Sequence, residues 1–301
     1  GDGKMSKSKG NVIYADELVD FFGVDAVRYF VLHEMPFEND GVITWELMVE
    51  RLNSELANTL GNLVNRTISM SNKYFGGLVE NKGVVEPVDE DLKAFALAVP
   101  GKVAEKMDKL RVADAMTEVF TLFKRLNKYI DETMPWALAK DEAKKDRLAT
   151  VLYNLVEGIT MGATLLESFM PETTERILAQ LNAEKRTLED LKTFGLYPSG
   201  NKVTEKPEIL FARLDLKEVL AKVEELHPKK EEPVEEKKEE NVIDIEAKPE
   251  ITFDDFGKLQ FQVGEIIACE EVKKSRKLLC SQVKIGSQVR QIVSGIKAHY
   301  S

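Results

Sequence analysis

Apolar residues recur at steps of three and four over most of the chain, which is the spacing of one face of an amphipathic helix. One stripe runs through Leu52, Leu56, Leu60, Leu63 and Val64. A second runs through Val112, Met116, Val119, Phe123, Leu126 and Ile130. A third runs through Leu148, Val151, Leu155, Ile159, Leu166 and Phe169, and a shorter helix is expected over 173–181. Helices of this kind with short connections predict an antiparallel helical bundle.

Shorter helices are predicted on both sides of the bundle. Residues 15–22 and 25–34 have helical patterns, and Gly23 separates them at a position typical of a helix end. Residues 216–226 form a further short helical pattern. Between that pattern and the bundle the sequence is irregular, and we expect it to fold back on the bundle through Ile209, Leu210 and Phe211.

The period changes towards the C-terminal end. Residues 227–250 are rich in Glu and Lys and poor in apolar side chains, so they predict an acidic, flexible linker. Strand-like alternation follows at Phe261, Val263, Glu265 and Ile267, and again at Ser281, Val283 and Ile285. The sequence therefore predicts a mostly α protein that ends in a β-rich module. We divide it at 1–43, 44–226, 227–250 and 251–301.

Composition narrows the class of protein. The formal net charge of -10 argues against a protein that coats nucleic acid through its overall field, although it leaves a local basic site open. Cys269 and Cys280 form no Cys-x-x-Cys pair, which predicts reduced cytoplasmic thiols rather than zinc ligands or disulfides. His33, His227 and His299 lack nucleophile or metal-ligand spacing, so we expect structural or surface roles and no metal site. No run of 18 apolar residues predicts a membrane span.

The most informative stretch is the polar loop near the start, Lys4, Met5, Ser6, Lys7 and Ser8. Lysines and hydroxyls are suited to a polyphosphate because they offer charge-assisted and neutral donors. A generic lysine–serine stretch is more often a solvated loop. This one, however, resembles the KMSKS signature of class I aminoacyl-tRNA synthetases at all five positions, and it continues with the family's usual Gly-Asn.

The resemblance implies a role for each loop residue. In that family the loop closes over ATP, with Mg²⁺, while the amino acid carboxylate attacks the α-phosphate. Lys7 would be the main stabiliser of the leaving pyrophosphate and Lys4 would assist it, while Ser6 and Ser8 would shape the loop or contact phosphate. The family's other signature, His-Ile-Gly-His, is absent from the sequence, as is the amino acid pocket. We therefore expect a C-terminal fragment that is inactive alone, and its zinc content stays open.

Two further stretches favour methionine as the amino acid. Residues 37–41 with 52–66, and residues 127–136, resemble methionyl enzymes, especially bacterial ones. The resemblance implies methionyl-adenylate formation and transfer of methionine to tRNA(Met). Two alternatives stay open: a class I synthetase of another specificity, and a non-catalytic tRNA-binding protein that retains the loop.

The same stretches suggest an anticodon-binding site. Asn62 and Arg66 lie one helical turn apart, on a face about 100–140° from the leucine stripe. An Asn can read a base edge and an Arg can fork to a base or phosphate. In methionyl enzymes the matching residues contact the CAU anticodon, and a Trp after a proline, here Trp136 after Pro135, stacks on a base. The alternatives are a solvated Asn/Arg pair and a Trp in the core, which is the role we expect for Trp45.

Residues 251–301 resemble part of the small dimeric tRNA-binding OB-fold domain that many bacterial methionyl enzymes carry. OB-folds bind oligonucleotides on a curved β surface. Lys273, Lys274, Arg276 and Lys277 could meet RNA phosphates, or they could be an ordinary lysine-rich surface turn. The complete domain would allow a homodimer.

Overall fold

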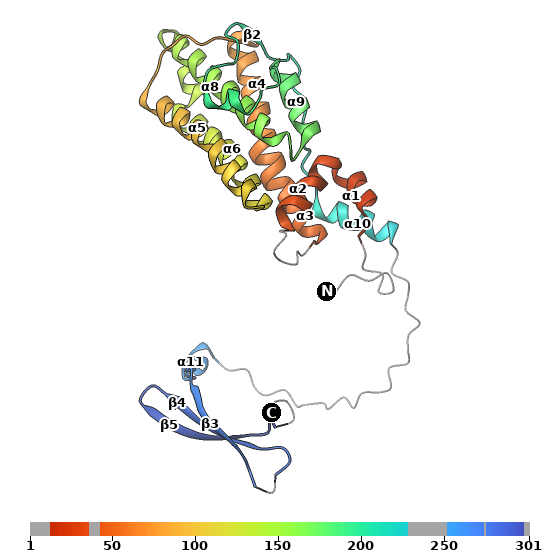
Figure 1. Ribbon diagram of the computed structural model, residues 1–301, viewed down its shortest axis with the longest axis vertical. Coiled ribbons are helices and arrows are strands. Elements are labelled where there is room, and N and C mark those ends of the chain that lie inside the picture. The colour runs from red at the N-terminus through yellow and green to blue at the C-terminus, as the bar shows by residue number, and fades with distance from the viewer. Residues whose placement is uncertain (1–12, 36–42, 228–251, 274, 298–301) are drawn as a thin grey trace. The chain divides into compact units, whose positions relative to one another are not determined.

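The computed structural model describes residues 13–35, 43–227, 252–273 and 275–297. The chain divides into two compact units, residues 1–230 and 231–301, each described by itself below (Figure 1). The loop residues 4–8, the linker residues after His227, Lys274 and His299 lie outside the described residues.

The first unit is a helical bundle in which α4, α5, α6 and α8 lie side by side (Figure 1). The longer helices are α4 (Asn62–Phe75), α5 (Pro87–Asp108), α6 (Val112–Thr133), α8 (Lys145–Leu166) and α9 (Pro171–Leu181). The shorter elements are α1 (Ala15–Phe22), α2 (Val24–Glu34), α3 (Trp45–Arg51), the π-helix η2 (Leu52–Gly61), α7 (Pro135–Leu138), η3 (Glu142–Lys144), η4 (Glu189–Lys192) and α10 (Leu216–Leu226). A two-stranded sheet of β1 (Leu78–Val79) and β2 (Asn201–Lys202) joins distant loops.

Helix α8 is the centre of the bundle, because every residue from Arg147 to Leu166 is buried. It packs against α4, α5, α6, α7 and α9. Among the described residues, the one helical stretch long and apolar enough to cross a membrane is Glu142–Leu166, which overlaps α8. It is buried inside the bundle, and that burial accounts for its apolar composition.

Most of the predicted helices are confirmed, including α1, α2, α9 and α10. Gly23 ends α1 with a φ of 82°, a conformation that favours glycine. One long helix was missed: α5 contains Pro100 in its interior, and its buried apolar stripe includes the small Ala96. The segment before α10, which was expected to fold back on the bundle through Ile209, Leu210 and Phe211, was predicted in part. Leu210 is buried, but Ile209 is 71% exposed, so the prediction that it packs on the bundle was wrong.

The second unit is a three-stranded antiparallel sheet in the order β3 (Glu265–Glu271), β4 (Leu279–Ile285), β5 (Gln288–Ser294), preceded by the short helix α11 (Phe253–Gly257). The strand prediction is confirmed at Glu265 and Ile267 and at the positions within β4. It was wrong for Phe261 and Val263, which precede β3 and are 83% and 97% exposed.

Candidate functional site

The first part of the candidate site is the junction between η2 and α4. The backbone N–H of Asn62 donates to the carbonyl of Ala57, five residues earlier, so the wide π-helical turn continues to the first residue of α4. Asn62 is exposed and Arg66 is half-buried, while Leu63 and Val64 beside them are buried. Among the described residues, neither the Asn62 nor the Arg66 side chain has a hydrogen-bond or ion-pair partner. Both groups are therefore open to a ligand.

Two contacts fix how η2 runs along α6. Lys124 Nζ lies 3.0 Å from Glu55 Oε1, and Asn127 Nδ2 donates to the carbonyl of Thr59 at 3.0 Å. The residue numbers rise together on both helices, so the helices run parallel. Asn127 was not predicted to have a role of its own. The sequence signal for such a role is that Asn127, a polar residue, directly follows Leu126, which belongs to the buried apolar stripe of α6.

The parallel course brings two distant stretches to the same level of the bundle. With a helical rise of 1.5 Å per residue, Arg66 lies about 10 Å beyond Thr59, and Pro135 lies about 12 Å beyond Asn127. On this estimate of about 1.5 Å per residue, the face that carries Arg66 and the end of α6 that leads to Trp136 lie at about the same height along the bundle.

The chain changes direction sharply before Trp136. Met134 ends α6 in the left-handed conformation, with a φ of 45°. Pro135 then occupies the first position of α7, where its missing N–H costs nothing. Pro135 is buried and holds the turn, whereas Trp136 is 43% exposed. The alternative of a core tryptophan does not fit this exposure. Trp45, in contrast, packs on Phe21 and Phe22, with ring centroids 5.1 and 6.0 Å away, as predicted.

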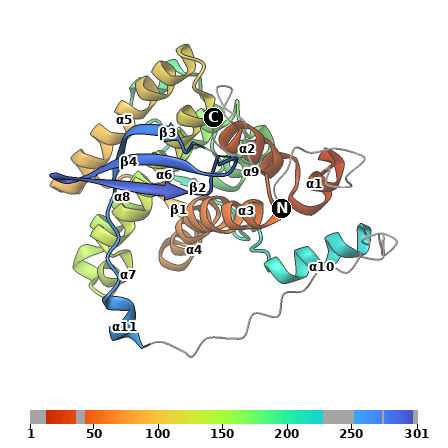
Figure 2. The same cartoon turned by 90° about the horizontal axis from the view of Figure 1, so that it is seen from below.

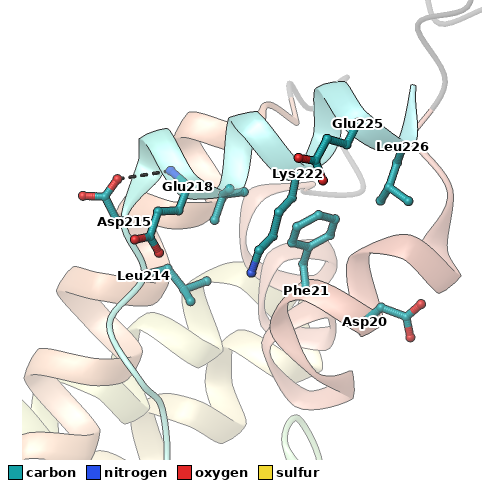
Figure 3. Close-up of a pocket in the computed structure, with 9 residues that line it drawn as sticks. Asp20, Phe21, Leu214, Asp215, Glu218, Lys222, Glu225 and Leu226 are labelled. Atoms are coloured by element: carbon teal, nitrogen blue, oxygen red, sulfur yellow. Dashed lines mark hydrogen bonds between the residues drawn. The ribbon is translucent and has the colours of Figure 1, made fainter. Parts of the chain in front are cut away.

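The opposite end of the bundle carries the helices that follow the lysine-rich loop. Helix α10 returns to α1, where His227 Nε2 lies 2.8 Å from Glu17 Oε1 (Figures 1 and 2). Between the two helices lies a pocket of about 470 Å³ whose lining includes Phe21 and Lys222 (Figure 3). His33 stacks on Tyr29 and hydrogen-bonds Thr117, and both contacts fit the structural role expected for it.

A buried ion pair between Asp89 and Arg147, missed from the sequence, helps to hold the bundle together. Asp89 accepts two hydrogen bonds from Arg147, at 2.5 and 3.0 Å, and one from the Tyr129 hydroxyl at 2.6 Å. Burial raises the pKa of the Asp89 carboxyl, but the Arg147 and Tyr129 hydrogen bonds outweigh it and hold that pKa below its usual value. Asp89 and Arg147 find their hydrogen-bond partners within the core, so this ion pair has a structural role.

In the second unit, the basic residues lie in the connection between β3 and β4. Lys273, Arg276 and Lys277 are all exposed there. Exposure is compatible with phosphate contacts and equally with a solvated turn, so the RNA-binding role of these residues stays a prediction.

Comparison with known proteins gives three consecutive family matches. Residues 1–68 match the model described as tRNA synthetases class I (M). Residues 81–226 match the anticodon binding domain of methionyl tRNA ligase, and residues 261–301 match a putative tRNA binding domain.

Individual relatives agree with these matches. The chain is 47% identical over 298 residues to methionine–tRNA ligase of Clostridium perfringens, which covers 99% of this chain and 45% of the relative. It is 48% identical over 301 residues to methionine–tRNA ligase of Caldanaerobacter subterraneus subsp. tengcongensis, covering 99% and 46%. The chain thus spans less than half the length of these curated relatives.

Solved structures show the same fold. The crystal structure of apo Mycobacterium tuberculosis methionyl-tRNA synthetase aligns with a TM-score of 0.63 at 32% identity, covering 68% of this chain and 41% of that one. The same enzyme in complex with methionyl-adenylate aligns with a TM-score of 0.65 at 34% identity, covering 69% and 41%. The helical bundle and the matched models define a class I aminoacyl-tRNA synthetase. The chain belongs to the methionyl-tRNA synthetase family, which confirms the resemblance drawn from its residues.

Proposed function

We propose that this chain is part of a methionine–tRNA ligase, which forms methionyl-adenylate from ATP and methionine and transfers methionine to tRNA(Met) in the cytoplasm. The names of its relatives support this function. Because the chain spans 45% of such a relative, the activity belongs to a polypeptide of the relatives' length, and we expect the chain alone to be inactive.

The bundle would read the anticodon. The observation that carries this role is the exposed indole of Trp136. The helical rise puts it at about the level of the open face of Asn62 and Arg66. An exposed tryptophan offers a stacking surface to an unpaired base, and an Asn and an Arg beside it can supply donors to base edges and phosphate. Pro135 fixes the direction in which the indole leaves the backbone.

The loop of residues 4–8 would serve the chemical step. Donors aimed at the leaving pyrophosphate stabilise the transition state more than the ground state, and Lys7, assisted by Lys4, would supply them to ATP–Mg²⁺. Lys273, Lys274, Arg276 and Lys277 would add sequence-independent contacts to tRNA phosphates, and the complete tRNA-binding domain would support a homodimer.

Aminoacylation by the full-length enzyme tests the anticodon-reading role. A stacked base contributes about 1–3 kcal/mol, so Trp136→Ala should lower kcat/KM for a CAU transcript by about 5- to 150-fold. The advantage of CAU over a changed anticodon should shrink with it. Leu188→Ala is the matched control, because Leu188 is 72% exposed on the same unit but belongs to the loop after α9.

Three outcomes would contradict the proposal. If Trp136→Ala keeps full anticodon discrimination, the bundle loses its assigned role. If the parental enzyme performs pyrophosphate exchange with isoleucine, leucine or valine instead of methionine, the specificity is wrong. If it binds tRNA but exchanges with no amino acid, the protein is a non-catalytic tRNA-binding protein.

A further inference from the structure

Helix α2 holds both sides of the corner between α8 and α9 with two charged side chains. Arg28 Nε donates to the carbonyl of Phe169 at 2.6 Å, and its Nη2 donates to the carbonyl of Ser168 at 3.0 Å. Asp25 Oδ2 accepts the backbone N–H of Thr173 at 2.6 Å, in the first turn of α9. Asp25 and Arg28 are three residues apart, so both project from one face of α2.

Each charge matches the backbone groups that it meets. The carbonyls after α8 lie at the negative end of that helix, and the first N–H groups of α9 lie at a positive end. An arginine faces the former and a carboxylate the latter. The two side chains therefore satisfy backbone groups that the helices themselves leave without partners.

The burial of Asp25 sets this contact apart from ordinary packing. Asp25 is 5% exposed, and its other oxygen, Oδ1, is buried without a hydrogen-bond partner among the described residues. A buried carboxylate that is only partly satisfied costs stability, and apolar side chains would hold two helices together without that cost. A buried polar group of this kind calls for a reason other than packing strength.

Hydrogen bonds supply what apolar contacts lack, which is direction. Apolar surfaces can slide over each other with little change in free energy, whereas a hydrogen bond weakens steeply as its angle falls. Three directional bonds to one corner fix the orientation of α2 on the bundle. Helix α2 follows the ATP-handling residues 4–8 in the sequence, with α1 between them, and α8 also packs against α7, which carries Trp136.

We propose that Asp25 and Arg28 are positioning residues that couple the seating of tRNA on the bundle to the ATP-handling end of the enzyme. They do so by locking α2 to the α8–α9 corner, so that the anticodon face and the segment after the loop move as one body. This inference rests on the proposed function, because it needs an enzyme that reads an anticodon at one end and handles ATP at the other.

Steady-state kinetics of the full-length enzyme separate coupling from packing. Arg28→Gln should lower kcat for aminoacylation of the CAU tRNA by about 5- to 150-fold, the range of typical coupling between two sites. The KM for tRNA and the tRNA-independent pyrophosphate exchange rate should each stay within about twofold, since neither needs the two ends to act together. Arg28→Lys keeps a charged donor and replaces Arg28→Gln in the test if that variant does not fold. We expect Arg28→Lys to lower kcat less than Arg28→Gln and to leave KM and pyrophosphate exchange unchanged.

The carboxylate side of the contact has its own conservative variant. Asn at position 25 can still accept the Thr173 N–H, so Asp25→Asn should retain most of the kcat that Asp25→Leu loses. Arg111→Gln is the matched control, because Arg111 pairs with Asp114 on the surface. Removing this exposed ion pair should leave the aminoacylation and pyrophosphate exchange rates unchanged. The Arg28→Gln and Trp136→Ala losses should be non-additive in the double variant, because each breaks the same connection.

Any of three results would overturn the coupling. One is a kcat for Arg28→Gln within about twofold of the parental value. The second is a fall in pyrophosphate exchange parallel to that in aminoacylation, which would mark a packing defect. The third is simple additivity with Trp136→Ala. Failure of the proposed function is a different result, because it would appear in the parental enzyme as missing methionine-dependent exchange or missing anticodon preference.

Discussion

Glu157, in the middle of α8, forms a two-pronged ion pair with Arg186 in the loop after α9. Each carboxylate oxygen accepts one guanidinium N–H, at 2.7 and 2.6 Å. The same carboxylate accepts the backbone N–H groups of Gly195 at 2.9 Å and Tyr197 at 2.8 Å. The side chains of Glu157 and Arg186 are 0% and 8% exposed. One carboxylate on the central helix therefore fixes the course of a loop far along the chain.

We predict that Glu157→Gln strongly destabilises the helical unit. The change leaves the Arg186 guanidinium buried without a counter-charge, and breaking a buried pair in this way costs about 3–5 kcal/mol. Urea unfolding of the chain, followed by circular dichroism, measures the loss. The control is Glu189→Gln, which removes an exposed pair with Lys192 and should cost less than about 1 kcal/mol. Equal losses in the two variants would contradict the structural role of Glu157.

The same ion pair predicts how stability depends on pH. Burial raises the pKa of the Glu157 carboxyl, but Arg186 and the backbone N–H groups of Gly195 and Tyr197 outweigh it, so the net pKa is lowered. A carboxyl whose pKa is lower in the folded state contributes stability above its unfolded pKa, near 4.3, and loses that contribution as the pH falls through the folded value. The parental chain should therefore lose stability below about pH 4.3, and Glu157→Gln should show a shallower loss.

A glycine on α8 allows close packing of α6. A Cβ added at Gly162 would lie 2.5 Å from Phe123 Cε1 and 2.9 Å from its Cζ. Gly162→Ala should therefore cost about 1–3 kcal/mol through overpacking, although alanine favours helix. The control is Gly101→Ala, in the exposed interior of α5 with nothing within 4 Å, which should gain about 0.5–1 kcal/mol. Thermal unfolding of both variants checks the opposite signs.

The side-chain amide of Asn53 holds the segment before α10 against η2. Its Nδ2 donates to the Leu214 carbonyl and its Oδ1 accepts the Leu214 N–H, both at 2.9 Å. Asn53→Ala should cost about 1–3 kcal/mol because both backbone groups lose a partner. Hydrogen exchange should rise at 209–226 and stay unchanged in α8. Asn58→Ala, at an exposed position on the same helix, is the control; a similar rise there would contradict the role of Asn53.

Lys7 is the residue on which the proposed chemistry depends most, although it lies outside the described residues. In the full-length enzyme Lys7→Ala should slow methionine-dependent pyrophosphate exchange by about a hundredfold or more, the effect of losing one donor to a developing charge. Methionine affinity should change little. Lys222→Ala, on α10, is the control for loss of a lysine. An exchange rate for Lys7→Ala within about twofold of the parental rate would exclude Lys7 as the pyrophosphate stabiliser.

Local pattern was enough to predict the helices whose stripes are made of large apolar residues. Leu56, Leu60 and Leu63 are fully buried, as their spacing indicated, and Gly23 ends α1 where its freedom of φ is used. The same pattern could not reveal that Leu52–Gly61 is a π-helix, because steps of four suit a wide turn as well as an α-helical one. Helix α5 was missed because an interior proline and small side chains weaken the local signal.

The sequence by itself determined the family, because the family is recognised by the order of residues in the loop 4–8 and in the stretches 52–66 and 127–136. Only the tertiary structure decided which side chains face outward and which polar groups meet. The exposure of Trp136 depends on a left-handed residue at the end of α6, and the contact of Arg28 with the α8–α9 corner joins residues 140 or more positions apart. Burial and long-range hydrogen bonds arise from packing of the whole bundle, whereas periodicity and motif report only on neighbours in sequence.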